Sequence, residues 1–248
     1  MIKQTLVLIF LMAASLSAHA VILEGSFSGT IYDSFDVDNY DGTTFFGGAT
    51  SGGQNGQTLT GSFTIDTDLM PADSCADAAF GCYQNTDYTI NFLQISMTID
   101  GKTFGSHSVT SYESVYTQDV TYDNYSVGEQ SLEVGFDTSG TIYTYEGFRG
   151  YFNFTDYIDD IISGDSAIQD FVWTDNDGTD YGSGEYFVTN YTLDFNTNTH
   201  THWDNFEGSF YLSSMSLHEQ SASVPEPTSL ALLALGLAGL GLSRKRRV

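Results

Sequence analysis

Alternation of apolar and polar residues is the feature that most constrains the fold of this chain. Between Gln57 and Asp66 every second residue faces one side, so that Leu59, Gly61, Phe63 and Ile65 share a face. A period of two is typical of a β-strand with one buried face. The same alternation recurs in Val21–Ile31, Leu93–Ile99, Leu132–Phe136, Phe187–Phe195 and Phe210–Leu217. These segments predict an all-β fold, an antiparallel β-sandwich with a jelly-roll arrangement as one option.

Two local signals add to this prediction. Asp100-Gly101 is the residue pair of a tight hairpin turn and predicts that the strand ending at Ile99 folds back at once. Ile158, Ile161 and Ile162 have helical spacing and are followed by Gly164, so we expect a helical turn or two on a surface loop.

A short repeated sequence pattern, the Gly-Ser-Phe pattern, relates three of the predicted strands. Leu23–Phe27, Leu59–Phe63 and Phe206–Phe210 each place Gly-Ser-Phe two residues after an apolar one. The spacing between the copies is irregular, which excludes a solenoid. Glycine within a strand often marks the close approach of a backbone or a ring, so the three strands are expected to be neighbours. We expect the first and last strands to close the sheet.

The first 20 residues have the three parts of a secretory signal peptide in the required order. Met1–Thr5 is short and basic, Leu6–Ala14 is apolar, and Ala18-His19-Ala20 is a small-residue cleavage site. Cleavage after Ala20 would make Val21 the first residue of the mature protein.

The other end of the chain also carries a targeting pattern. Val224, Pro225, Glu226 and Pro227 precede an uncharged segment, residues 228–243, and then a basic tail, residues 244–248. The apolar run Leu230–Leu242 would be about 20 Å long as a helix, which is short for a ~30 Å hydrocarbon core but can be extended by its flanks. The basic tail behind it predicts a single C-terminal transmembrane helix with the large domain outside the inner membrane.

Together, these C-terminal residues closely resemble the PEP-CTERM sorting signal. The resemblance covers residues 223–248 and implies recognition by an exosortase, a membrane cysteine transpeptidase, with cleavage near Pro225-Glu226-Pro227. It also implies a Gram-negative host that produces exopolysaccharide. The alternative is a plain C-terminal anchor that is never cut.

The chain is thus expected to consist of a signal peptide (1–20), a β-sandwich ectodomain (21–222) and a sorting signal (223–248). Charge is distributed unevenly among these parts. All 32 acidic residues lie between Glu24 and Glu226, where Lys102 and Arg149 are the only basic ones, so that stretch carries a formal charge of −30. Such a field repels phosphate backbones, which argues against nucleic acid as a partner.

Cys75 and Cys82 are the only cysteines of the chain and lie in one predicted loop. In an exported protein such a pair favours a disulfide. Two cysteines without neighbouring histidines would make a poor zinc site.

Metal ligands are suggested only weakly. Asp36, Asp38 and Asp41 form one Asp-rich loop and Asp175 and Asp177 another, but neither has EF-hand spacing. Asp and Gly in β-loops usually just make turns, so calcium is left open and no other cofactor is expected. His200 and His202 would share a face of an extended strand, although no third ligand is evident.

No catalytic site is evident in the sequence. A nucleophile elbow, a phosphate loop and HExxH are absent, and 32 acids are too many to select a catalytic pair. The leading hypothesis is a non-enzymatic surface or extracellular-matrix protein that is sorted by an exosortase and associated with exopolysaccharide or biofilm. The alternatives are a carbohydrate-binding or adhesive module, and a secreted hydrolase with an unrecognised site.

Overall fold

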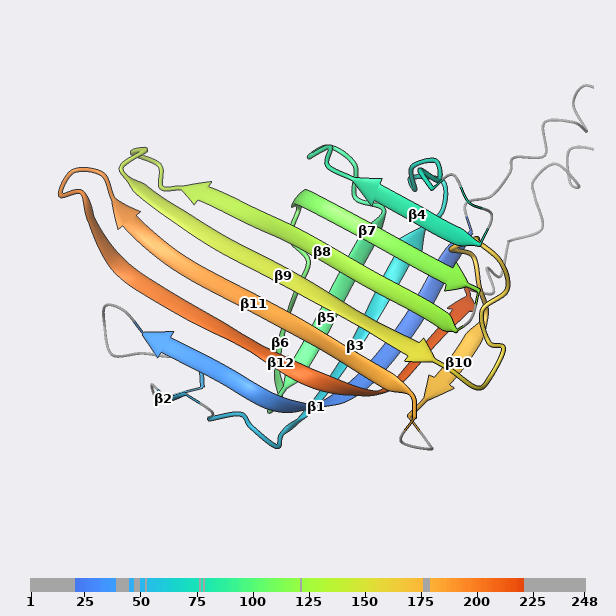
Figure 1. Cartoon of the computed structure of the whole chain (residues 1–248). Helices are drawn as coiled ribbons and strands as arrows, with labels where there is room; N and C mark the ends of the chain where they lie inside the picture. Colours follow the sequence, from blue (N-terminus) through green and yellow to red (C-terminus); the bar gives the residue numbers. More distant parts are fainter. Residues whose placement is uncertain are drawn as a thin grey trace, which may run out of the picture.

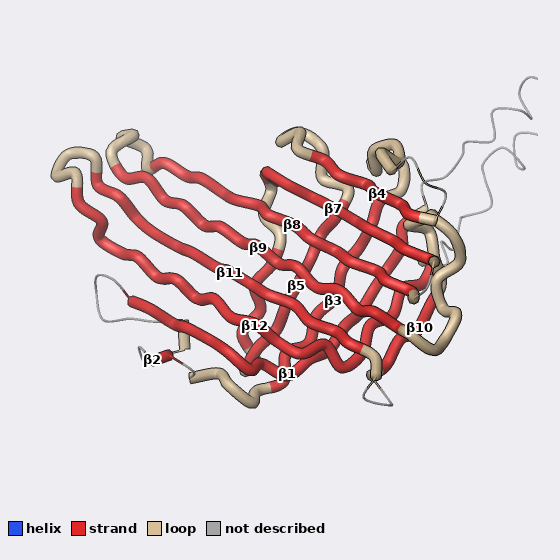
Figure 2. The backbone as a smooth tube through the Cα atoms, viewed as in Figure 1, coloured by secondary structure: helices blue, strands red, loops and turns tan. Residues whose placement is uncertain are grey.

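A computed structural model describes residues 21–38, 45–46, 50–51, 53–75, 77, 79–120, 122–175 and 179–220. The predicted signal peptide and sorting signal lie outside these ranges. Every regular element of the described part is a β-strand (Figure 2). The strands are β1 (Ile22–Asp38), β2 (Thr50–Ser51), β3 (Thr58–Asp66), β4 (Phe80–Asn85), β5 (Leu93–Ile99), β6 (Lys102–Gly105), β7 (Val109–Asp119), β8 (Asp123–Phe136), β9 (Ile142–Asp156), β10 (Phe171–Thr174), β11 (Tyr181–Asp194) and β12 (Thr199–Glu219).

The all-antiparallel prediction is confirmed, but two separate sheets are not found. The described strands form one 12-stranded open sheet in the order β4-β7-β8-β9-β11-β12-β1-β3-β5-β6, with β10 beside β12 and β2 beside β1. A sandwich or jelly roll of two separate sheets is therefore the wrong topology. The first and last strands do pair, but in the middle of the sheet rather than at a closing edge.

This single sheet folds over on itself at β1 and β12. The β1–β12 pairing shifts register between Ser28 and Gly29 and between Ile31 and Asp33. Such bulges bend strands and increase their twist. In Figure 1, β7, β8, β9 and β11 run diagonally through one layer while β3 and β5 cross behind them. The fold therefore reaches two layers without a second sheet.

The core fills the space between the two layers. Phe27 of β1 stacks on Phe152 of β9 with ring centroids 4.0 Å apart, and Phe63 of β3 lies 5.4 Å from the same ring. Leu59, Phe63 and Ile65 are at most 1% exposed, as their alternation predicts. Trp173, Tyr125 and Tyr186 are the largest of the fully buried side chains in the described part.

The Gly-Ser-Phe pattern is explained by ring-over-glycine packing, in which the phenylalanine ring of one strand lies over the glycine of its neighbour. β12, β1 and β3 are neighbours, as predicted, and Gly25 pairs with Phe63 while Phe27 pairs with Gly61. A Cβ at Gly25 would lie 2.1 Å from Cζ of Phe63, and one at Gly61 would lie 2.2 Å from Cζ of Phe27. Each glycine thus leaves room for the phenylalanine of the adjacent strand.

The two local predictions have opposite outcomes. Asp100 and Gly101 both have positive φ, 48° and 75°, and join β5 to β6, so the hairpin is confirmed. The predicted helical turn around Ile158 to Ile162 is wrong. There the amide of Ile158 donates to Asp156, and those of Ile161 and Ile162 donate to Asp123, 2.5 and 2.7 Å away. Side-chain carboxylates take these donors, so the segment stays a loop.

Candidate functional site

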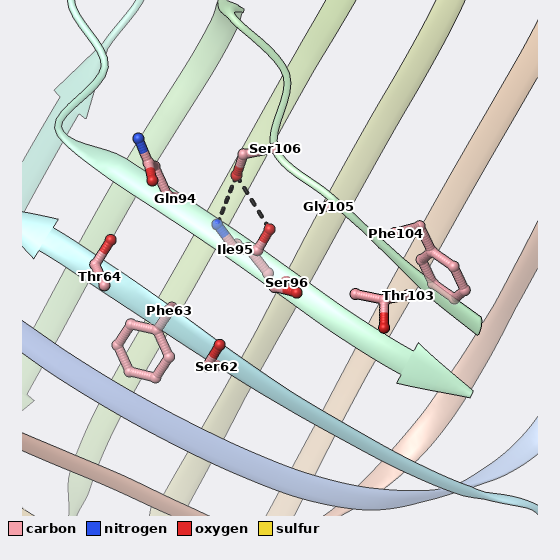
Figure 3. Close-up of a pocket in the computed structure, with 10 residues that line it drawn as sticks. All are labelled: Ser62, Phe63, Thr64, Gln94, Ile95, Ser96, Thr103, Phe104, Gly105 and Ser106. Carbon is pink, nitrogen blue, oxygen red and sulfur yellow. Dashed lines mark hydrogen bonds between the residues drawn. The ribbon is translucent and has the colours of Figure 1, made fainter. Parts of the chain in front are cut away.

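The outer face of β3, β5 and β6 is lined by hydroxyl groups and holds an open groove of about 350 Å³ (Figure 3). A row of hydroxyl residues starts in the groove and crosses the neighbouring strands, because each residue is the cross-strand partner of the next. The row consists of Thr103, Thr98, Thr60, Ser28, Ser214 and Thr174. Within this row Thr98 and Thr103 are hydrogen-bonded at 2.8 Å, as are Ser28 and Ser214. These cross-strand bonds stabilise the sheet and account for much of the row.

Ser106, at one end of the groove, covers the exposed edge of β5. Its hydroxyl oxygen accepts the amide of Ile95 at 2.6 Å and lies 3.1 Å from the carbonyl oxygen of the same residue (Figure 3). The short strand β6 pairs only with Ser96–Ile99, so the edge of β5 before Ser96 has no strand beside it on that side.

A pair of buried glutamates takes the place of the missing strand. Glu113 of β7 and Glu129 of β8 lie directly opposite each other and are 0% and 1% exposed. Glu113 accepts the amide of Leu93 at 2.8 Å, and Glu129 accepts the amide of Ile95 at 3.0 Å and the hydroxyl of Ser106. We call this arrangement the glutamate seam, because it joins the edge of β5 to the other layer.

Burial governs the charge of the glutamate seam. Desolvation raises the pKa of Glu129 to about 7, opposed by hydrogen bonds from Ser106, Ser131 and the amide of Ile95, while Glu113 raises it further. Desolvation also raises the pKa of Glu113, against hydrogen bonds from Asn85 and from the amide of Leu93. Paired carboxylates with raised pKa values often mark catalytic sites, but these two side chains are at most 1% exposed.

The positions of Glu113 and Glu129 within their strands could have indicated the glutamate seam, but the sequence has so many acids that the two do not stand out. Glu113 shares the inward parity of Val115, and Glu129 shares that of Tyr125 and Val127. An acid at an inward position of an alternating strand is unusual, and this criterion would have picked out Glu113 and Glu129 together with Asp123 of β8.

A second cluster of acids, also not predicted, lies at one end of the sheet. Carboxylate oxygens of Asp119, Asp123 and Asp160 lie within 4.8 Å of one another, close enough to share a divalent cation. Desolvation is the main cause of the raised pKa of Asp123. Asp123 accepts the amides of Ile161 and Ile162, and Asp119 accepts that of Gly164 at 2.7 Å, so two of the acids already anchor the loop.

Of the Asp-rich loops of the sequence, only part lies within the described residues. Asp36 is 5% exposed, and its carboxylate accepts the amides of Phe45 and Phe46 at 3.1 and 2.9 Å, which makes it a structural residue. Asp175 is exposed just after β10. Asp38 ends β1, and Asp41 and Asp177 lie outside the described residues.

The two histidines do not share a face, contrary to expectation. The β11–β12 pairing shifts register between Thr192 and Leu193, whose partners are His202 and His200. His200 therefore packs on Trp203, with centroids 4.9 Å apart, whereas Nε2 of His202 lies 3.3 Å from Oδ2 of Asp204. The bulge separates the two imidazoles that a common metal would need.

Cys75 and Cys82 are bonded to each other in the structure, with Cα atoms 5.2 Å apart. Asp73 accepts both of their amides, at 2.9 and 2.8 Å, which holds the loop in this shape. Since disulfide sulfurs do not bind metal, the neighbouring Asp73 does not complete a metal site.

We predict that this disulfide is present in protein recovered from the outside of the cell. Intact mass without reduction should lie two hydrogens below the value after reduction, and closing so short a loop should contribute about 2.5 kcal/mol in the chain-entropy model. Fresh exported protein in which both Cys75 and Cys82 react with an alkylating reagent would contradict the prediction.

Partly exposed rings form a distal aromatic patch on the hairpin ends of β8–β9 and β11–β12, defined as Phe136, Tyr143, Tyr145, Tyr191, Phe195, His200 and Trp203. Tyr145 and Tyr191 stack at 4.9 Å, and Phe136 is 62% exposed. In Figure 1 these hairpin ends extend beyond β3 and β5. Desolvation, then the hydroxyl of Tyr143, raises the pKa of Tyr191 to about 12. Exposed apolar surfaces of this kind often mark interaction sites.

Comparison with known families concerns the C-terminal end. The family model of the PEP-CTERM protein-sorting motif matches residues 223–247. The chain carries a PEP-CTERM sorting signal. This match includes the predicted motif Val224–Pro227 and most of the basic tail.

The PEP-CTERM signal marks an exported protein whose sorting depends on an exosortase. Residues 1–20, with the predicted cleavage site Ala18 to Ala20, and the predicted membrane segment 228–243 lie outside the described residues. Among the residues that are described, no helix is long and apolar enough to cross a membrane. No curated protein matches the chain.

Proposed function

We propose that this PEP-CTERM protein is a non-catalytic component of the cell surface or extracellular matrix that associates with exopolysaccharide. The single observation that carries the proposal is the sorting signal at residues 223–247. It follows a large, strongly acidic β-domain, which suits a secreted protein that must remain soluble in a hydrated matrix.

The glutamate seam supports a non-catalytic role. Glu113 and Glu129 are cross-strand partners, but both side chains are at most 1% exposed. A hydrolase would need its carboxylates at a surface that sugar and water can reach. If the purified mature protein degrades any polysaccharide in a substrate screen, the alternative of a secreted hydrolase replaces this proposal.

A carbohydrate-binding or adhesive module is the second candidate. The distal aromatic patch favours it, because Phe136 and Phe195 expose 62% and 50% of their surface on a folded domain. Flat rings can stack on the apolar faces of sugars, so a matrix protein could hold polysaccharide directly.

We predict that Glu226→Ala blocks processing in the native host. In the sequence, Pro-Glu-Pro stands between the β-domain and the predicted membrane helix. Its two prolines predict an extended segment, and loss of the carboxylate should abolish recognition. The variant should accumulate as a membrane-retained form that keeps its tail but has lost its leader. The mass of the C-terminal peptide in membrane and surface fractions measures this.

Glu219→Ala provides the matched control, because Glu219 is an exposed acid at the end of β12 only seven residues away. This variant should be cut normally. Unmodified protein from the surface or the medium that still contains Arg244–Arg247 would show that the tail is a plain anchor. Cofractionation of the mature protein with exopolysaccharide tests the matrix role itself.

A further inference from the structure

A groove of about 410 Å³ crosses the outer face of β4, β7, β8 and β9. Small residues form its floor, since Ser114 pairs with Gly128 and Tyr116 pairs with Ser126. Its rim carries the tyrosines Tyr112, Tyr116, Tyr122, Tyr151 and Tyr157. Large side chains around a floor of glycine and serine turn an otherwise flat sheet face into a trough, within the size range of ligand sites. We call it the tyrosine–amide groove.

Primary amides alternate with the rings along this groove. Gln118 and Asn124 are paired across β7 and β8 and are 8% and 9% exposed, while Asn153 lies two residues from Tyr151 on β9. Their positions are fixed, since Tyr116 donates to Gln118 at 3.2 Å and Asn124 donates to the carbonyl of Phe154 at 2.8 Å. Rigid side chains lose little freedom when a ligand binds.

Charge is excluded from the lining. None of the described residues that line the groove is Asp, Glu, Lys or Arg. The stretch that contains it nevertheless carries a formal charge of −30. An uncharged surface with rings, amides and hydroxyls in such a domain suits a ligand that is neutral and rich in hydroxyl groups.

We propose that the tyrosine–amide groove binds a neutral polysaccharide chain. The rings of Tyr112 and Tyr151, which are 37% and 38% exposed, stack on the apolar C–H faces of the sugar. Amides such as Asn153 exchange hydrogen bonds with its hydroxyl groups, since a primary amide both donates and accepts. The proposal rests on the proposed function and names the class of exopolysaccharide that the protein would hold.

Other occupants fit the groove less well. A second copy of the chain, an anionic polysaccharide and a nucleic acid all bring negative charge toward an acidic domain, which repels them. The distal aromatic patch has rings, but the one amide described in contact with them, that of Asn205, already accepts the indole N–H of Trp203 at 3.2 Å, so the patch is the weaker sugar site.

The test compares binding of the full mature protein from the native host with binding of its variants. The probes are cellulose and mannan as neutral polysaccharides, alginate as an anionic one, and the host's own exopolysaccharide. Tyr112→Ala/Tyr151→Ala should weaken binding to a neutral probe about tenfold, because two stacking contacts are lost. Tyr112→Phe/Tyr151→Phe keeps both rings and should retain most of the binding.

Two further variants keep the result decisive. Phe136→Ala/Phe195→Ala removes two exposed rings of the distal aromatic patch and should leave binding unchanged. Asn153→Asp keeps the shape of the side chain and its bond from Ser183, at 3.2 Å, but brings negative charge into the groove and should weaken binding several-fold. This change tests the groove even if the double alanine variant fails to fold.

The proposal is overturned if the mature protein binds none of the neutral probes, including a neutral host polymer, or binds alginate more tightly than any of them. It is also overturned if folded groove variants bind polysaccharide as well as the unmodified protein does. The same holds if Phe136→Ala/Phe195→Ala weakens polysaccharide binding as much as the groove variants do. Finally, it is overturned if the groove variants lose self-association of the protein and not polysaccharide binding. Its failure is distinguishable from that of the proposed function. If the groove variants still cofractionate with the matrix, only the groove assignment is rejected. If the groove binds a neutral polysaccharide but the protein does not cofractionate with the matrix, only the matrix role is rejected.

Discussion

Glu129→Gln is expected to leave the free energy of unfolding nearly unchanged near pH 4.5 and to raise it by about 3 kcal/mol above pH 7, relative to the unmodified protein. The reason is the burial of Glu129, which is 1% exposed and whose pKa rises from 4.5 to about 7 on folding. A buried glutamine keeps an acceptor for the amide of Ile95 but never ionises.

The direction of this effect follows from the raised pKa. A carboxyl whose pKa is higher in the folded state contributes its full stability below the unfolded value of 4.5. That contribution is lost as the pH rises from 4.5 to about 7, because the unfolded chain ionises over this range while burial keeps the proton on Glu129 in the folded protein. Burial raises the pKa of Glu113 too, so it acts in the same direction.

Denaturant unfolding of both proteins at several pH values between 4.5 and 8.5 measures the difference. Glu133→Gln is the matched control, because this glutamate lies on the same strand with 63% of its side chain exposed. The control should follow the unmodified protein at every pH. A difference between Glu129→Gln and the unmodified protein that stays constant over the whole range would show that folding does not raise the pKa of Glu129.

Gly25→Ala is expected to destabilise the protein by about 3 kcal/mol, a large effect for a single methyl group. The new Cβ would lie 2.1 Å from Cζ and 2.2 Å from Cε1 of Phe63. That ring is 1% exposed and lies 6.4 Å from Phe27 and 5.4 Å from Phe152 between centroids, so it has no space into which it can turn. Equilibrium unfolding in urea measures the loss.

A double-mutant cycle separates this clash from a general intolerance of alanine. Phe63→Ala alone should cost about 3–5 kcal/mol through the cavity that it leaves. Adding Gly25→Ala to Phe63→Ala should then cost almost nothing, because the clashing ring is gone, which gives a coupling energy of about 2–3 kcal/mol. Ser26→Ala, an exposed neighbour on the opposite face, removes only a hydrogen bond to Ser216 at 2.9 Å and should cost no more than about 1 kcal/mol. Additive costs in the cycle would reject the ring-over-glycine explanation.

Many strands could be predicted because each depends on residues close together in the chain. Leu59, Phe63 and Ile65 alternate with polar residues, and all three are buried. The strands are longer than the apolar runs suggest, and β12 extends from Thr199 to Glu219 although its clearest signal begins at Phe210. Serine, threonine and aspartate continue a strand when a neighbour supplies its backbone hydrogen bonds, and this contribution cannot be found in a local pattern.

The candidate sites were less accessible to prediction because their parts come from distant segments. Glu113 and Glu129 become a pair only when β7 and β8 meet in one register, and the edge that they cover belongs to β5. The groove likewise needs Tyr116, Ser126 and Tyr151 from three strands. The error on His200 and His202 has the same origin, because a bulge in the β11–β12 pairing turns one of them over.

The sequence by itself determined what is written in contiguous residues: the sorting signal matched at residues 223–247, the strand character of the domain, its acidity, and the glycines that must lie under rings. Only the tertiary structure decided that one sheet folds into two layers at β1 and β12, and which acids, rings and amides lie together. A two-residue period fixes which side of a strand is buried but carries no information on its neighbour. Strand order and bulges are chosen by the packing of the whole core, where Phe27, Phe63 and Phe152 meet from three different strands.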